Sequence, residues 1–127
     1  MLAVVGYLMT AAGVRFPGAG DVPAGFKAIP YLLESKSGQN VLLQMGAFIA
    51  VATIVNRDAD WIDNEAEFVG DYRNGAIDYG WDKFSPEEKI KKRTIELNNG
   101  RAAMCGIIGL FYHESIGVSI LPGGWLP

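Results

Sequence analysis

The segment from Ser85 to Glu114 constrains the fold more than any other part of the chain. Ser85 offers an N-cap hydroxyl, Pro86 suits the first helical position, and Glu88 stands three residues after the cap. No helix breaker follows until after Glu114, so the sequence predicts one helix over residues 86–114. Such a helix is about 43 Å long, which exceeds both a typical soluble helix and the ~30 Å hydrocarbon thickness of a bilayer.

Two further apolar stretches are predicted helices. Residues 1–16 form an apolar run that stops at Pro17 and Gly18, and residues 40–55 carry no charged side chain. The second run is slightly shorter than the ~20 residues that cross a bilayer, so hydropathy alone also allows a buried core helix. The first run begins without a cap or a charged leader, and we expect Met1 to lie within a longer first helix.

Composition narrows the class of protein further. The 127 residues are 50% hydrophobic and 20% charged, and 16 of them are glycine. The long apolar runs exclude a disordered chain, and a single cysteine, Cys105, excludes a disulfide scaffold. The formal net charge of −3 gives no footprint for a nucleic-acid partner. The high hydrophobic and low charged fractions fit either a membrane protein with substantial loops or an apolar soluble bundle.

Polar side chains interrupt the apolar half of the predicted helix 86–114. Asn99 lies about 60° around the helix from Glu96 and one turn further on, so the two share a face. Arg101 lies about 140° around from Glu96 and cannot fold back onto it. A buried arginine needs an anionic partner and a buried glutamate a cationic one. Both partners are therefore expected from another helix.

His113 is the only histidine of the chain and stands near the end of the same helix. It lies roughly 25 Å along the axis from Glu96, so these two side chains cannot ligate one metal ion. A zinc or di-iron centre is therefore not expected. Separate single-ligand sites do fit, such as magnesium held by a macrocycle, which takes one axial oxygen or nitrogen ligand. Ala102 and Gly106 are small enough to let a flat cofactor or another helix approach closely.

Residues 88–114 resemble the third membrane helix of the light-harvesting chlorophyll-binding protein family. The resemblance is carried by Glu96-Leu-Asn-Asn-Gly-Arg-Ala-Ala-Met104 and by the closing Tyr112-His-Glu114. The loop over residues 67–81 is similar to the chlorophyll a/c branch, which includes the fucoxanthin– and peridinin–chlorophyll proteins. Residues 1–7 and 13–18 resemble the first membrane helix of the family and its exit.

The resemblance implies an all-α fold, a three-helix transmembrane light-harvesting bundle whose first helix is truncated at the chain start. The whole chain, 1–127, would be a single membrane antenna domain with helices at about 1–16, 40–55 and 86–114. The Glu-x-x-His-x-Arg motif of the family's first helix is expected immediately before Met1.

The resemblance also implies a set of chlorophyll ligands. Glu96 matches the family glutamate that ligates chlorophyll magnesium while it pairs with an arginine of the first helix. Asn99 matches a second magnesium ligand, and Arg101 matches the reciprocal arginine of the structural ion pair. His113 matches a further ligand position, and so does Gln44 in the second helix.

The implied function is that of a light-harvesting antenna subunit, which is not an enzyme. It would bind chlorophyll a, chlorophyll c and a carotenoid (fucoxanthin, peridinin or a related xanthophyll) and pass excitation energy to a photosystem. The expected partners are the core of photosystem I or II, neighbouring antenna subunits and thylakoid lipid, in a multi-pass protein of the plastid thylakoid membrane. Two alternatives stay open: a photoprotective, energy-quenching member of the same family, and a pigment-free helical interaction module.

Overall fold

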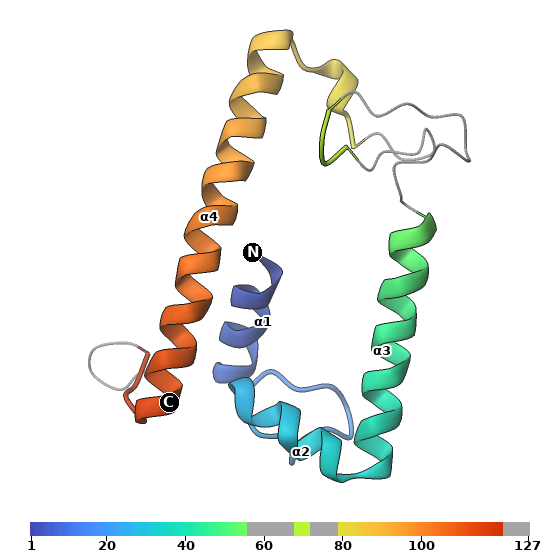
Figure 1. Cartoon of the computed structure of the whole chain (residues 1–127), viewed down its shortest axis with the longest axis vertical. Coiled ribbons are helices and arrows are strands. Elements are labelled where there is room, and N and C mark those ends of the chain that lie inside the picture. Colours follow the sequence, from blue (N-terminus) through green and yellow to red (C-terminus); the bar gives the residue numbers. More distant parts are fainter. Residues whose placement is uncertain (56–67, 72–78, 121–127) are drawn as a thin grey trace. The chain divides into compact units, whose positions relative to one another are not determined.

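The computed structural model describes residues 1–55, 68–71 and 79–120, and every regular element in these ranges is helical. Most of the segment between the second and third predicted helices, residues 56–85, lies outside them, including much of the loop over residues 67–81. The chain divides into two compact units, Met1–Gln39 with Arg93–Pro127 and Asn40–Lys92. In chain order the elements are α1 (Leu2–Ala11), η1 (Gly25–Lys27), α2 (Ala28–Glu34), α3 (Lys36–Val55), η2 (Trp81–Lys83) and α4 (Pro86–Ile116) (Figure 1).

The longest helix, α4, is capped at both ends by its own sequence. At the start, the backbone N–H of Ser85 donates to the Glu88 carboxylate at 3.0 Å, and the Glu88 N–H donates to Ser85 Oγ at 3.4 Å. At the end, Gly117 has a φ of 72° and its N–H donates to the Glu114 carbonyl at 3.2 Å. A left-handed glycine with this hydrogen bond closes a helix. The helix extends over 31 residues, or about 46 Å, and ends two residues beyond the expected 86–114.

The first helix ends earlier than expected. The prediction of a helix over 1–16 is wrong at its end, because α1 stops at Ala11. Gly13 takes a φ of 91°, and its N–H donates to the Thr10 carbonyl at 3.1 Å. The Arg15 guanidinium also donates to the Thr10 carbonyl, at 2.6 Å. Gly13 and Arg15 therefore both satisfy the Thr10 carbonyl from outside the helix, whereas in a longer helix the backbone of a further turn would have done so.

The segment between the first two predicted helices, residues 17–39, holds helical structure that the sequence did not predict. It contains η1 and α2, and Pro30 lies in the first turn of α2, where proline is tolerated. The hydroxyl of Ser35 accepts the Gly38 N–H at 3.0 Å, so that α3 begins at Lys36, four residues before the expected 40–55. Gly38 is buried against the backbone of Leu32, and a Cβ there would collide with it.

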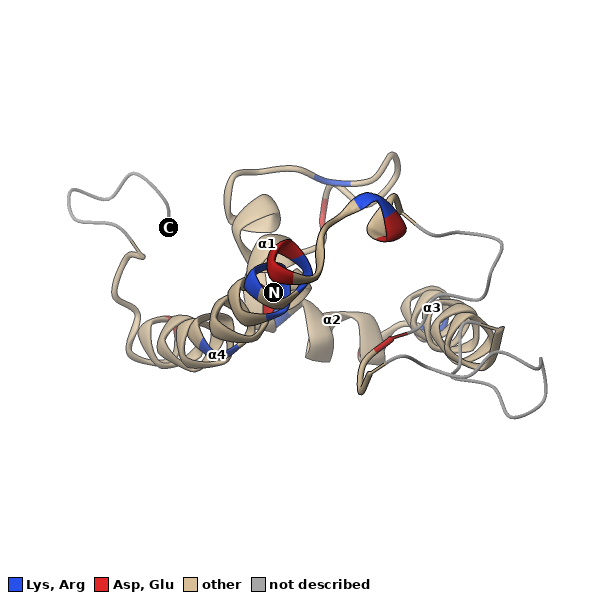
Figure 2. Cartoon of the chain, turned by 90° about the horizontal axis from the view of Figure 1, so that it is seen from above, with Lys and Arg blue, Asp and Glu red and all other residues tan. Residues whose placement is uncertain are grey.

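These extra residues bring α3 to the length of a membrane span. The helix has 20 residues and a mean hydropathy of 1.5, and among the described residues it alone meets both the length and the composition of a membrane-crossing helix. At 1.5 Å per residue it spans about 30 Å, the hydrocarbon thickness. α1 is a shorter apolar helix without a charged residue. Figure 2 shows α3 almost wholly tan, and its single charged residue is Lys36. α4 is long enough, but Glu96 and Arg101 interrupt its apolar half.

An aromatic cluster supports the start of α4. Trp81 lies between Phe68 and Phe84, with ring centroids 5.6 and 6.2 Å away. The ammonium groups of Lys89 and Lys92 lie over the rings of Trp81 and Phe84, at 5.8 and 4.5 Å from the centroids. These contacts hold η2 against the first turns of α4, through aromatic packing and cation–π attraction.

Candidate functional site

The end of α1, the short helix η1 and the last turns of α4 meet around Tyr7. Its ring lies 5.3 Å from that of Phe26, which in turn meets Phe111 edge to face at 5.1 Å. Tyr7 is 9% exposed and is the only buried apolar side chain among the described residues. The three rings come from three different elements, so they fix the end of α1 and η1 on the C-terminal turns of α4.

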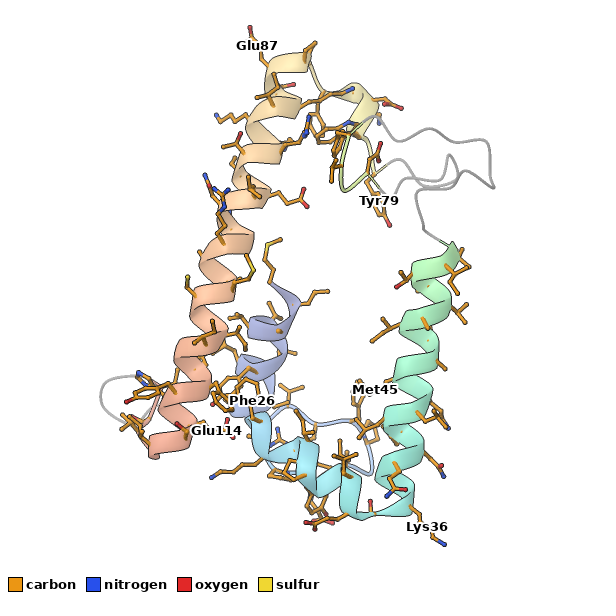
Figure 3. The ribbon with its side chains drawn as sticks, in the orientation of Figure 1. Phe26, Lys36, Met45, Tyr79, Glu87 and Glu114 are labelled. Atoms are coloured by element: carbon orange, nitrogen blue, oxygen red, sulfur yellow. The ribbon has the colours of Figure 1, made fainter. Side chains whose placement is uncertain are left out.

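Glu114 makes the polar contact of the same junction. Its Oε2 accepts the backbone N–H of Phe26 and its Oε1 accepts that of Lys27, both at 3.1 Å. Figure 3 shows the Glu114 carboxylate turned toward Phe26. Gly25 precedes Phe26 and has a φ of 70°. A Cβ at Gly25 would collide with the Glu114 carboxylate and lie 2.9 Å from the Tyr7 ring. Glycine is therefore required for both its backbone conformation and its size.

No role for Glu114 was predicted from the sequence, although the residue follows the predicted ligand His113. Its two backbone partners are 88 and 87 residues away in sequence, so no local pattern could have indicated them. The contact matters for the site because it fixes the turn of α4 that carries His113.

His113 is half-buried, and its ring is held by the backbone that follows α4. Nδ1 lies 3.4 Å from the carbonyl oxygen of Ser119. A carbonyl can only accept, so this contact requires the tautomer in which Nδ1 carries the proton. The lone pair of the neutral ring is then on Nε2, the form in which a histidine ligates a metal through one nitrogen while the other is hydrogen-bonded.

Asn99 is exposed on α4 and its amide is oriented by the helix backbone. Nδ2 donates to the Ile95 carbonyl at 2.8 Å. If the amide were turned around, Oδ1 would face the Ile95 carbonyl oxygen, and two acceptors would meet. Oδ1 is therefore directed away from that carbonyl. An amide oxygen is a hard donor of the kind that magnesium prefers.

Glu96 and Arg101 are both exposed on α4, and they do not form an ion pair with each other. Within the described ranges no hydrogen bond or ion pair involves either side chain. Their expected bridges to a first-helix motif therefore stay a prediction. Gln44 is exposed on α3, in the other compact unit from the three candidate ligands of α4.

The geometry of α4 separates its candidate ligands into two places. Glu96 and Asn99 stand one turn apart on the same face, whereas His113 lies about 25 Å from Glu96 along the continuous helix. Among the described residues no three His, Cys, Asp or Glu side chains come together as a metal site, so each place offers only one or two isolated oxygen or nitrogen donors. The residues present therefore fit a metal whose other ligands come from a bound organic group, such as the magnesium of a chlorophyll.

The surface of α4 between these places carries exposed apolar side chains. Met104 and Ile108 are 61% and 68% exposed. α1 lies close to α4 at Gly106, where a Cβ would be 4.0 Å from the Val4 side chain. The absence of a side chain at Gly106 allows this approach. Exposed apolar side chains beside single polar donors suit a large apolar ligand held by one axial bond.

Comparison with known proteins identifies the family of this chain. A family model described as chlorophyll A-B binding protein matches residues 1–115. The chain is 54% identical to the fucoxanthin-chlorophyll a-c binding protein D, chloroplastic, of Phaeodactylum tricornutum, over 96% of this chain and 62% of that protein. It is 43% identical to a fucoxanthin-chlorophyll a-c binding protein of Trieres chinensis, over 94% of this chain and 61% of the relative.

A more distant relative is the fucoxanthin-chlorophyll a-c binding protein B of Macrocystis pyrifera, at 37% identity over 91% of this chain and 54% of that protein. The chain thus spans less than two thirds of the length of these relatives. The match to the family model covers α1, α2, α3 and nearly all of α4, and it confirms the all-α, transmembrane light-harvesting class of fold. The chain belongs to the chlorophyll A-B binding protein family.

Proposed function

We propose that this protein is a light-harvesting antenna subunit that binds chlorophyll a, chlorophyll c and fucoxanthin, and that it is not an enzyme. The observation that carries the proposal is the hydrogen bonding of two side chains on α4. Asn99 gives its amide N–H to a carbonyl and keeps Oδ1, and His113 gives Nδ1–H to a carbonyl and keeps Nε2. Each side chain thus keeps one donor atom suited to an axial bond to chlorophyll magnesium.

The proteins that match this chain support the choice of pigments. The relatives of Phaeodactylum, Trieres and Macrocystis are all named for fucoxanthin and for chlorophylls a and c, which favours fucoxanthin over peridinin. The bound pigments absorb light and pass on the excitation energy. The chain itself supplies axial ligands, fixes the spacing and orientation of the pigments and covers them with apolar side chains.

We assign four axial ligands: Glu96, Asn99 and His113 on α4, and Gln44 on α3. Glu96 is also proposed to pair with an arginine of the family's first-helix motif, and Arg101 with the glutamate of that motif. Glu96 and Arg101 are charged residues within an apolar helix, which require partners of opposite charge in a membrane.

The apolar surface supports a membrane location. Where α1, η1 and α4 meet, only Tyr7 is buried, although α1 consists almost wholly of apolar residues. Exposed apolar area of this extent needs lipid, pigment or a neighbouring subunit to cover it. We therefore propose one multi-pass antenna domain over residues 1–127, in the thylakoid membrane of a plastid, beside the core of photosystem I or II and further antenna subunits. The relatives named as chloroplastic support the plastid.

Reconstitution of the full-length protein with chlorophyll a, chlorophyll c and fucoxanthin tests the proposal. Wild type should form a complex that absorbs visible light, and His113→Leu and Asn99→Leu should each lose about one chlorophyll, because leucine offers no lone pair. Asn98→Leu is the matched control, since Asn98 is an exposed asparagine of α4 that lies on another face from Glu96 and Asn99.

The outcomes separate the candidate functions. A protein that takes up no pigment would be the pigment-free helical interaction module. A pigmented complex with a short fluorescence lifetime would be a quenching member of the family, and a long lifetime supports light harvesting. Unchanged chlorophyll content in both ligand variants would refute the assigned ligands.

A further inference from the structure

The segment that follows α4 returns toward the helix and reaches the ring of His113. Gly117 takes a φ of 72°, and the Val118 N–H donates to the His113 carbonyl at 3.0 Å. This turn places the Ser119 carbonyl 3.4 Å from Nδ1 of the same histidine. Backbone and side chain of His113 are therefore both bonded to the residues immediately beyond the helix.

We propose that Gly117 and the Ser119 carbonyl are positioning groups for His113, and that together they make Nε2 the nitrogen that binds chlorophyll magnesium. The inference rests on the proposed function. Nδ1 is engaged by a carbonyl that can only accept, so the proton of the neutral ring is on Nδ1 and the lone pair on Nε2. The hydrogen bond also restricts rotation of the ring, so the donor atom is oriented before the pigment binds.

Gly117 is the residue on which this arrangement depends. Its positive φ is unfavourable for an L-residue with a Cβ, whereas asparagine tolerates this conformation better than other side chains do. No heavy atom lies within 4 Å of a Cβ built at Gly117, so the effect of a substitution there comes from the backbone conformation and not from a collision.

The rest of the last turn of α4 is fixed independently of Gly117. Glu114 is bonded to the backbone of Phe26 and Lys27, on the side of α1 and η1. Loss of the turn at Gly117 should therefore release the His113 ring while the helix that carries it stays in place. This separation allows a positioning role to be measured apart from general unfolding.

The test uses the full-length protein, reconstituted with chlorophyll a, chlorophyll c and fucoxanthin. The absorption difference between wild type and His113→Leu defines the band of the pigment that His113 binds. Gly117→Ala should weaken retention of that pigment by about 10-fold, the usual effect of losing an outer partner of a histidine ligand. Gly117→Asn should retain the band.

Gly13→Ala is the matched control. Gly13 has a φ of 91° and ends α1 with the same pattern of backbone hydrogen bonds, but no histidine lies beside it. We expect a similar loss of thermal stability in Gly13→Ala and Gly117→Ala, with the His113 band lost only in Gly117→Ala. An intact band in Gly117→Ala would overturn the proposal, and so would an equal loss of the band in Gly117→Asn or in Gly13→Ala.

A second measurement does not depend on the Gly117 variants. The ¹⁵N spectrum of the complex made with ¹⁵N-labelled histidine, with the His113 signals identified by their absence from His113→Leu, should show a protonated Nδ1 and an Nε2 bonded to magnesium. Magnesium on Nδ1 would overturn the proposal while leaving His113 as a ligand. If His113→Leu loses no pigment, the proposed ligand itself fails, and this result is distinguishable from failure of the positioning role alone.

Discussion

Glu114 caps the backbone at Phe26 across 88 residues of sequence, with Oε2 3.1 Å from the Phe26 nitrogen. The first N–H groups of a helix have no partner within the helix and are usually satisfied by a side chain just before it. The residue in that place before η1 is Ala24, which has no side-chain acceptor. Glu114 of α4 supplies the missing cap, and its negative charge suits the N-terminal end of a helix.

Removal of this cap should destabilise the junction. Glu114→Ala leaves the N–H groups of Phe26 and Lys27 without their acceptor, at a cost of about 1–3 kcal/mol. Thermal unfolding of the reconstituted protein, followed by circular dichroism, should show a clearly lower midpoint. Glu34→Ala is the control, because Glu34 is an exposed carboxylate at the end of α2, where negative charge is not stabilising. Equal midpoints for the two variants would show that the Glu114 contact does not stabilise the protein.

Gly25 should tolerate no larger residue. Gly25→Ala adds a Cβ that collides with the Glu114 carboxylate and also forces an L-residue to a φ of 70°. The strain of the backbone alone costs about 1–3 kcal/mol. Gly20→Ala is the comparison, since no atom lies within 4 Å of a Cβ there. A yield of folded complex as high for Gly25→Ala as for Gly20→Ala would contradict the close packing at Gly25.

The capping box of α4 should contribute measurably to stability. Ser85→Ala removes the hydroxyl that accepts the Glu88 N–H and costs about 1 kcal/mol. Hydrogen exchange of the first turn of α4 should become faster, while exchange near His113 stays unchanged. Ser115→Ala serves as the control, because its hydroxyl only bonds the Tyr112 carbonyl within the helix. Unaltered exchange at residues 86–90 would argue against the capping role.

Glu96→Leu should be more damaging than Asn99→Leu. Under the proposed function Glu96 is both a magnesium ligand and the partner of an arginine, and its loss strands a buried cation at a cost of about 3–5 kcal/mol. Asn99→Leu removes one ligand and leaves no charge unpaired. The yield of pigmented complex, with Asn98→Leu as the reference, measures the difference. Similar yields for Glu96→Leu and Asn99→Leu would mean that Glu96 has no second role.

The positions of the helices were largely predictable because their signals are local. Ser85, Pro86 and Glu88 predicted the start of α4, and their hydrogen bonds form within the first turn. The end of α1 also had a local signal, Gly13, but the longer apolar run to Phe16 led to too long a helix. α2 was not predicted, because Pro30 is typical of loops and is also tolerated in a first helical turn.

The sequence by itself determined how the proposed ligands of α4 are spaced, since the separation of Glu96, Asn99 and His113 on a continuous helix follows from 1.5 Å and about 100° per residue. Only the tertiary structure decided how the last of them is held. Glu114 meets Phe26 across 88 residues, and a turn after the helix brings the Ser119 carbonyl to the His113 ring. Helix periodicity relates residues within a few turns of one segment. A contact between distant segments, such as that of Glu114 with Phe26, depends on where loops return the chain, and the packing of Tyr7, Phe26 and Phe111 holds these segments together.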